Sequence, residues 1–249
     1  YDRLVKIGWS GEGVKLYAEG SSSGGPGPGK PSRPANGQRL LESLGVNVGA
    51  LASQAEAKGY TAAAGYTLVD ADNPKSAFHL DNIRKALTIV DQTNAARAAR
   101  GLPALRLTPT LMAQSAIQTN VGTKLVGHSR IFGVGENLAW GCAHDGAVDV
   151  WMGEESVYNA YVAEHPDRRL AWENANSLSK WSKANSDIYH DVGHYLNIIN
   201  PYCVAMGAAY NRVDPGAGGW SLGEGEVFTL SLPSGERTYT TAEFRALLG

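Results

Sequence analysis

Apolar positions after residue 80 recur every three to four residues in three long stretches, which is the spacing of amphipathic helices. The first stretch predicts a helix between residues 81 and 101, with Asp81 or Ser76 as its N-cap and Gly101 as its stop. Its apolar stripe is predicted to run through Ile83, Leu87, Val90 and Asn94.

The other two stretches predict a helix that begins near residue 108 and a helix across residues 147–162. Thr108 is a favourable N-cap, and Pro109 suits the first helical position because the N–H that it lacks would be unpaired there. One face of the first helix is predicted to hold Leu111, Met112, Ser115, Ala116 and Thr119. The second is predicted to carry Val150, Trp151, Val157, Tyr158 and Tyr161.

The flanking segments complete the predicted elements. Residues 38–60 predict two short helices interrupted at Gly45, and residues 240–249 predict a capped terminal helix. Strand composition occurs in residues 195–200, 204–212 and 226–233. Helices come first and strands gather later, so the order favours an α+β fold with antiparallel connections over a doubly wound parallel sheet.

Composition divides the chain into three parts. Gly, Ser and Pro dominate residues 19–37, which predicts a linker or an extended strap, and residues 1–18 are compatible with a short hairpin that turns near residues 10–13. We therefore expect a hairpin and linker over residues 1–37, a helical extension over residues 38–80, and the principal domain over residues 81–249.

Charge and hydropathy exclude some classes of partner. The 249 residues carry 22 Lys and Arg against 24 Asp and Glu, so the net charge of −2 provides no basic surface for nucleic acid or anionic membranes. No stretch approaches eighteen consecutive apolar residues, so we expect no transmembrane segment. The chain begins with Tyr, which is compatible with removal of an export signal.

The two cysteines, Cys142 and Cys203, allow two interpretations. A disulfide between them would close a loop of roughly sixty residues and stabilise the fold by about 4 kcal/mol in the chain-entropy model. Alternatively, both are buried free thiols that pack as small apolar side chains.

Four ionisable residues are the candidate chemistry: His128, Glu136, Glu154 and His194. Two imidazoles and two carboxylates suit a zinc ion with an open coordination position, and they also suit general acid and base chemistry. A zincin motif in residues 190–194 is disfavoured, because Asp191 is shorter than the glutamate a zincin needs; we expect His190 on the surface. A nucleophilic Ser129 lacks an orienting carboxylate at fixed spacing.

Several motifs follow one another in the chain: "GHS", "GENLAWG", Trp151 three residues before Glu154 with Tyr158 four residues on, and "GHYLNIINPYCVAMGAAY". In this order they resemble the motifs of the CAP superfamily, which groups cysteine-rich secretory proteins, insect venom antigens and plant pathogenesis-related proteins. The resemblance covers roughly residues 81–232. It implies an α-β-α sandwich with a central antiparallel sheet, and a cleft that holds two histidines and two glutamates. By motif these correspond to His128, Glu136, Glu154 and His194.

The departures from the family pattern favour its bacterial branch. Leu196, Asn197 and Asn200 follow His194 where eukaryotic members have other residues, and the single cysteine pair excludes their multiple disulfides. Glu155 beside Glu154 leaves the second glutamate open to two assignments, of which the spacing favours Glu154.

The resemblance implies a secreted, extracellular bacterial protein whose cleft binds a divalent metal or a small ligand such as a lipid, a sterol or a cell-wall component. His128 and His194 would hold the metal, with zinc the first candidate, and Tyr158, Tyr195 and Asn197 would lie in the cleft. The alternative is a metal-dependent hydrolase of peptides or wall polymers, in which Glu136 or Glu154 acts as general base.

Overall fold

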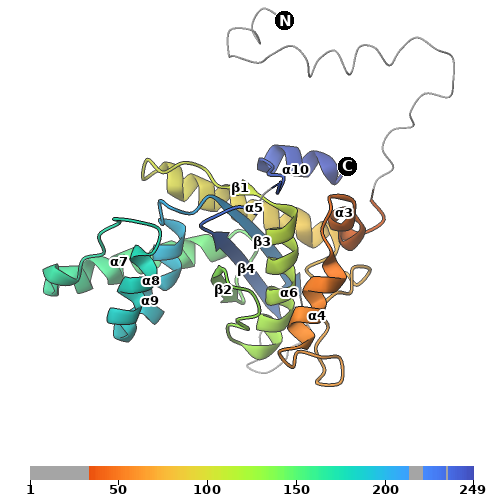
Figure 1. Cartoon of the computed structure of the whole chain (residues 1–249), viewed down its shortest axis with the longest axis horizontal. Coiled ribbons are helices and arrows are strands. Elements are labelled where there is room, and N and C mark those ends of the chain that lie inside the picture. Colours follow the sequence, from red (N-terminus) through yellow and green to blue (C-terminus); the bar gives the residue numbers. More distant parts are fainter. Residues whose placement is uncertain (1–33, 213–220, 234) are drawn as a thin grey trace, which may run out of the picture. The chain divides into compact units, whose positions relative to one another are not determined.

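The computed structural model describes residues 34–212, 221–233 and 235–249, and residues 34–249 form one compact unit. The predicted hairpin and most of the predicted linker, residues 1–33, lie outside the described residues. The described part contains eight α-helices, a short 3-10 helix and four strands (Figure 1). The elements are α3 (Gly37–Ser43), α4 (Val48–Glu56), α5 (Leu80–Ala98), β1 (Arg106–Leu107), α6 (Pro109–Leu125), β2 (Gly135–Trp140), α7 (Ala147–Glu164), η1 (Pro166–Arg168), α8 (Ser177–Ala184), α9 (Ser186–Ile198), β3 (Ala205–Arg212), β4 (Leu222–Thr229) and α10 (Thr241–Leu247).

The four strands form one sheet in the order β1-β3-β4-β2. β3 and β4 pair antiparallel along their whole length, from Ala205 opposite Thr229 to Arg212 opposite Leu222. β2 adds to the other side of β4, also antiparallel. The two-residue β1 pairs with β3 in parallel, so the expectation of a purely antiparallel sheet is wrong at this edge. The fold is α+β, as the sequence predicted.

Helices cover both faces of the sheet. On one face, α6 lies so close to β3 that a Cβ at Gly207 would be 2.2 Å from the backbone carbon of Leu111. Successive residues of a strand face opposite sides, so Glu226, next to the partner of Gly207, faces the other way and accepts a hydrogen bond from Thr93 of α5. The sheet is therefore the middle layer between α6 and α5 (Figure 1).

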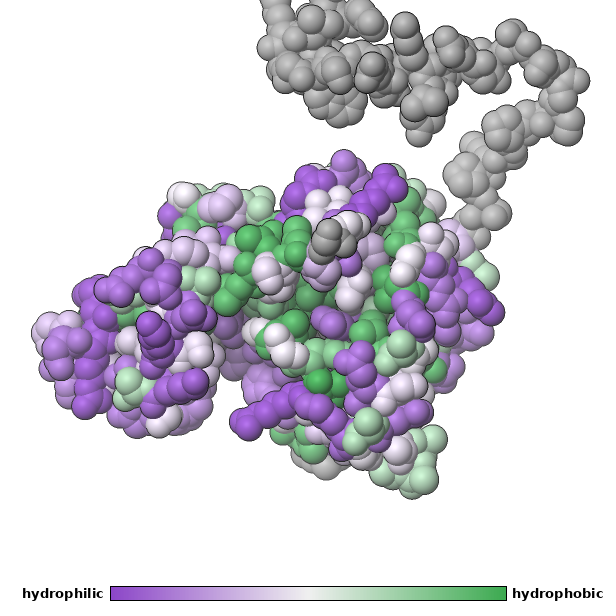
Figure 2. Space-filling model, viewed as in Figure 1, coloured by the Kyte–Doolittle hydropathy of each residue, from purple (hydrophilic) through white to green (hydrophobic). Residues whose placement is uncertain are grey.

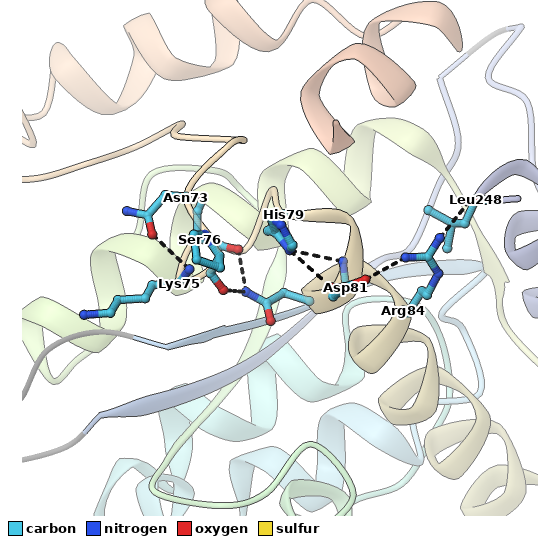
Figure 3. Close-up of polar contacts among 9 residues, drawn as sticks. Asn73, Lys75, Ser76, His79, Asp81, Arg84 and Leu248 are labelled. Atoms are coloured by element: carbon cyan, nitrogen blue, oxygen red, sulfur yellow. Dashed lines mark hydrogen bonds and ion pairs between the residues drawn. The ribbon is translucent and has the colours of Figure 1, made fainter. Parts of the chain in front are cut away.

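The long helix α5 buries Ile83, Leu87 and Val90 of its predicted stripe, but Asn94 is only partly buried and the predicted cap is wrong. Neither Asp81 nor Ser76 caps it: the N-cap is His79, whose Nδ1 accepts from the Asp81 main-chain N–H at 3.3 Å (Figure 3). Ser76 instead accepts a side-chain hydrogen bond from Asn82 through its carbonyl, at 2.8 Å. The helix ends at Ala98, and Gly101 has the left-handed φ of 68° expected of a residue that follows a helix.

The starts of α6 and α7 are close to those predicted. Thr108 caps α6 through its side chain, which accepts from Leu111 N at 3.1 Å. In α7, Trp151 and Tyr158 are buried as predicted, whereas Val150 and Val157 are 58% and 41% exposed. The predicted inner face of α7 is thus wrong at Val150 and Val157. Each precedes a buried residue in the sequence, but a helix turns by 100° per residue, so neighbouring residues face different sides.

The strand predicted over residues 195–200 is wrong. Residues 195–198 form the end of α9, which begins at Ser186 and ends at Ile198. The apolar residues Ile188, Val192 and Leu196 recur every four residues, and this helical spacing outweighs the strand preference of the isoleucines. Helix α8, with buried Leu178 and Trp181, was not predicted.

The helices of residues 38–60 form as predicted on either side of Gly45, which has a left-handed φ of 96°. The linker ends earlier than predicted, because Asn36 is already the N-cap of α3. Leu40, Leu41 and Val48 are buried in the same apolar core as α5 and α6. Residues 38–80 therefore share the core of the principal domain.

Both cysteines are free, so the disulfide interpretation is wrong. Cys142 follows Gly141, whose N–H donates to Leu222 O at 3.1 Å, and Cys203 precedes Val204, whose N–H donates to Thr229 O at 2.9 Å. Leu222 and Thr229 are the two ends of β4, about 23 Å apart at 3.3 Å per residue. A disulfide requires Cα atoms within about 7 Å.

Replacing Thr240 by Ala is expected to lower the free energy of unfolding by about 1 kcal/mol. Thr240 begins α10 with a capping box: its side chain accepts from Glu243 N at 3.2 Å, and Glu243 accepts from Thr240 N at 2.6 Å. Urea unfolding measures the change. Thr241→Ala, one residue further on, is the control, and an equal loss in both variants would contradict the capping role.

Candidate functional site

Four elements carry the four candidate residues to one side of the sheet. His128 lies in the loop between α6 and β2, Glu136 lies in β2, Glu154 in α7 and His194 in α9. β2 is an edge strand, so the elements beyond it can approach its residues directly. In Figure 2 the hydrophilic layer of α7, α8 and α9 is set off from the sheet and α6 by a recess in the surface.

The first histidine pairs with the first glutamate. His128 Nδ1 lies 2.7 Å from Glu136 Oε2. The other oxygen of Glu136 accepts a hydrogen bond from Gln118 Nε2 of α6. Gln118 also accepts from Phe132 N at 3.2 Å through its own oxygen, so one buried amide orients the carboxylate and fixes the loop after His128.

The second histidine pairs with the second glutamate. His194 Nδ1 lies 2.5 Å from Glu154 Oε1, and Glu154 Oε2 accepts from the main-chain N–H of Tyr195 at 3.0 Å. The neighbouring Glu155 is bound instead by Arg100 and by Tyr195 Oη. Glu154, and not Glu155, therefore lies against His194.

The two imidazoles lie face to face. The ring centroids of His128 and His194 are 6.2 Å apart at an interplanar angle of 27°, and His194 stacks on Trp151 with the same centroid distance and angle. The side chains of His128 and His194 are 43% and 24% exposed, whereas Glu136 and Glu154 are 8% and 17% exposed. His128 is thus the most exposed of the four side chains and Glu136 the most buried.

Each imidazole has the kind of carboxylate contact that often supports a metal-binding histidine. A carboxylate that engages Nδ1 fixes the ring orientation and leaves Nε2 for a metal, which is the usual support behind metal-binding histidines. Across residues 34–212, 221–233 and 235–249, no group of three or more His, Cys, Asp and Glu side chains is placed to hold a metal. The chain would supply two nitrogen ligands, and water or a bound ligand would supply the others.

A buried hydrogen-bond network connects α9 with the sheet. Asn137 of β2 donates through Nδ2 to His194 O at 3.1 Å and to Glu226 Oε1 at 2.8 Å, and its oxygen accepts from Asn197 Nδ2 at 2.9 Å. Burial raises the pKa of Glu226 to about 7, although hydrogen bonds from Thr93 and Asn137 oppose the rise. The network fixes the backbone that carries His194.

Sequence reasoning placed Asn197 in the cleft but missed the other members of this support. Gln118 and Asn137 give no periodic signal. Glu226 gives a weak one, because a glutamate in a run of strand residues that is otherwise apolar is costly unless it is hydrogen-bonded. The unusual glutamate could thus be noticed in the sequence, but its hydrogen-bond partners could not.

The two predicted cleft tyrosines are largely buried, at 6% exposure each. Tyr158 Oη accepts from Leu170 N at 2.9 Å and its ring packs on Trp181, so it belongs to the core between α7 and α8. Burial, reinforced by Glu155, raises the pKa of Tyr195 to about 12, which leaves it a neutral hydrogen-bond donor. His190 is 69% exposed beside Asp191, as predicted for a surface residue.

No family model and no curated protein matches the sequence. Within the described residues, no helix combines the length and the apolar character needed to cross a bilayer.

Proposed function

We propose that the protein is a CAP-type domain that binds a divalent cation of the zinc class through His128 and His194, together with a small ligand that completes the coordination. One observation carries the proposal: each imidazole has its Nδ1 on a glutamate, and the two rings lie 6.2 Å apart at the surface. When bound, the cation would polarise an oxygen or nitrogen atom of the ligand.

Binding accounts for the glutamates better than hydrolysis does. A general base needs an oxygen that can reach a water molecule. In Glu136 the two oxygens are occupied by His128 and Gln118, and in Glu154 by His194 and Tyr195 N. Each of the four oxygens already has one such contact, and the two carboxylates are only 8% and 17% exposed, so they are better placed to orient the imidazoles than to reach a water molecule. We therefore favour a binding protein over the hydrolase that was the alternative.

The fold agrees with this proposal at the level of its layers. The sheet lies between α6 on one face and α5 on the other, and the residues that match the family motifs come together at the edge strand β2. The parallel β1 pair is a departure from the expected sheet. Secretion, an extracellular location and a lipid, sterol or cell-wall ligand belong to the same proposal.

Replacing His194 by Ala is expected to weaken zinc binding at least a hundredfold, because one of two protein ligands is lost. Isothermal titration with Zn²⁺ measures the affinity directly. In the wild type, zinc at 100 times its dissociation constant should add about 2.7 kcal/mol to stability and raise Tm. His128→Ala should behave like His194→Ala.

His190→Ala is the matched control, because His190 lies one turn before His194 on α9 and is exposed. It should bind zinc as the wild type does. The proposal fails if His190→Ala weakens binding as much as His194→Ala, or if the wild type binds no zinc at neutral pH.

A further inference from the structure

The loop that carries His128 has an unusual backbone. Val126 and Arg130, on either side of His128, have left-handed φ values of 54° and 52°, and no other described residue except glycine has a positive φ. Such conformations are strained for a residue with a side chain, and most of all for a β-branched one such as Val126. The surrounding structure must hold this loop in place.

Two side chains from the segment after α4 hold it. Tyr60 Oη donates to Ser129 O at 3.0 Å, and Lys58 Nζ donates to Arg130 O. The two carbonyls directly follow His128, whereas Val126 N and Gly127 N before it donate to Gly122 O at the end of α6. The loop is thus anchored on both sides of the histidine.

The bracing segment is itself fixed. Tyr60 packs edge to face on Tyr66 with ring centroids 5.2 Å apart, and Lys124 of α6 lies over the Tyr66 ring at 4.7 Å. Lys124 also donates to the carbonyls of Ala64 and Gly65. Residues 58–66 are therefore bound to the same helix from whose end the loop departs, and the distance between Tyr60 and the loop is set by α6.

We propose that Tyr60, assisted by Lys58, is a positioning residue of the candidate site: it holds the strained 126–130 loop so that His128 Nδ1 stays on Glu136. The inference rests on the proposed function for its zinc readout. Ser129 Oγ is buried and finds no hydrogen-bond partner among the described residues, so its hydroxyl does not do this work. Residues 38–80, expected as an extension, thereby become part of the site.

The test compares Tyr60→Phe with Tyr66→Phe. Each variant loses one hydroxyl and keeps its ring in the same aromatic pair, but only the Tyr60 hydroxyl bonds the His128 loop in the described structure. Tyr60→Phe should weaken zinc binding about tenfold, the lower end of the range for residues that orient a ligand. Tyr66→Phe should bind as the wild type does. Lys58→Met should weaken binding in the same direction as Tyr60→Phe.

A second readout does not need zinc. In the metal-free protein, the ¹⁵N chemical shifts of the two ring nitrogens report which of them is hydrogen-bonded. Tyr60→Phe should change the His128 shifts and leave those of His194 unchanged. A purely structural role would lower Tm of both aromatic variants without moving the zinc affinity or these shifts.

The proposed function and the positioning role of Tyr60 can be contradicted independently of each other. If the wild type binds no zinc, the proposed function fails, and the ring shifts still test the positioning. If Tyr60→Phe keeps wild-type His128 shifts, the positioning role is overturned whether or not zinc binds.

Discussion

Replacing Glu224 by Gln should stabilise the protein at pH 8 by as much as about 4 kcal/mol and have little effect at pH 4.5. Glu224 lies on β4 between Ala139 of β2 and Tyr210 of β3, and it is fully buried. No donor among the described residues reaches either of its oxygens. The carboxylate form is therefore strongly disfavoured in the folded protein.

The direction of this pH effect follows from the pKa of Glu224. Burial raises the pKa of Glu224 from 4.5 to about 8 in the folded state. Between these values the folded protein keeps a proton that the unfolded chain releases, so the stability falls as the pH rises through this range. Glutamine has the same shape and cannot ionise, so the variant avoids that loss.

Urea unfolding at several pH values between 4.5 and 8 measures the effect. The difference between Glu224→Gln and the wild type should grow with pH and level off above about 8. Glu164→Gln, at the exposed end of α7, is the control and should run parallel to the wild type. Parallel curves for Glu224→Gln as well would show that Glu224 is ionised in the folded state.

Replacing Arg97 by Met should lower the free energy of unfolding by about 3 kcal/mol. Arg97 of α5 is fully buried and donates to three carbonyls: to Pro103 O at 3.0 Å, to Ile198 O at 2.6 Å and to Asn200 O at 2.9 Å. Methionine fills a similar volume but leaves these acceptors buried without donors.

The loss of these hydrogen bonds should destabilise the end of α9 most, because two of the three carbonyls lie at or just after its last residue. Arg100→Met is the control, two residues after the end of α5: Arg100 pairs with Glu155 near the surface, where such a pair contributes at most about 1 kcal/mol. Chemical denaturation of both variants makes the comparison. Equal stabilities would contradict the proposed role of Arg97.

Patterns that repeat within a few turns predicted the elements well. The starts of α6 and α10 follow from Thr108 and Thr240, since a cap depends on the next three residues alone. The inner face of α7 was harder, because Val150 and Val157 are as apolar as their buried neighbours. Residues 195–198 were misassigned because their strand composition was weighed without the four-residue apolar spacing of Ile188, Val192 and Leu196.

For the candidate site as well, the sequence identified some residues and only the structure showed the others. Motif order identified His128, Glu136, Glu154 and His194, and the structure pairs them as two imidazole–carboxylate contacts. In the structure Glu155 lies against Arg100, so Glu154 is the glutamate that contacts His194. Tyr60 lies 69 residues from the carbonyl that it bonds, and nothing in the local sequence connects the two.

By itself the sequence determined the α+β class, most of the helices and the residue types available for chemistry, because caps and apolar periods act over short distances along the chain. Only the tertiary structure decided that β1 runs parallel to β3 and that Cys142 and Cys203 lie near opposite ends of β4. It also decided that Gln118 bonds Glu136, that Asn137 bonds the backbone of His194, and that Tyr60 bonds the loop of His128. Those outcomes depend on strand order and on the packing of distant segments, where the gain from burying apolar surface outweighs local preference.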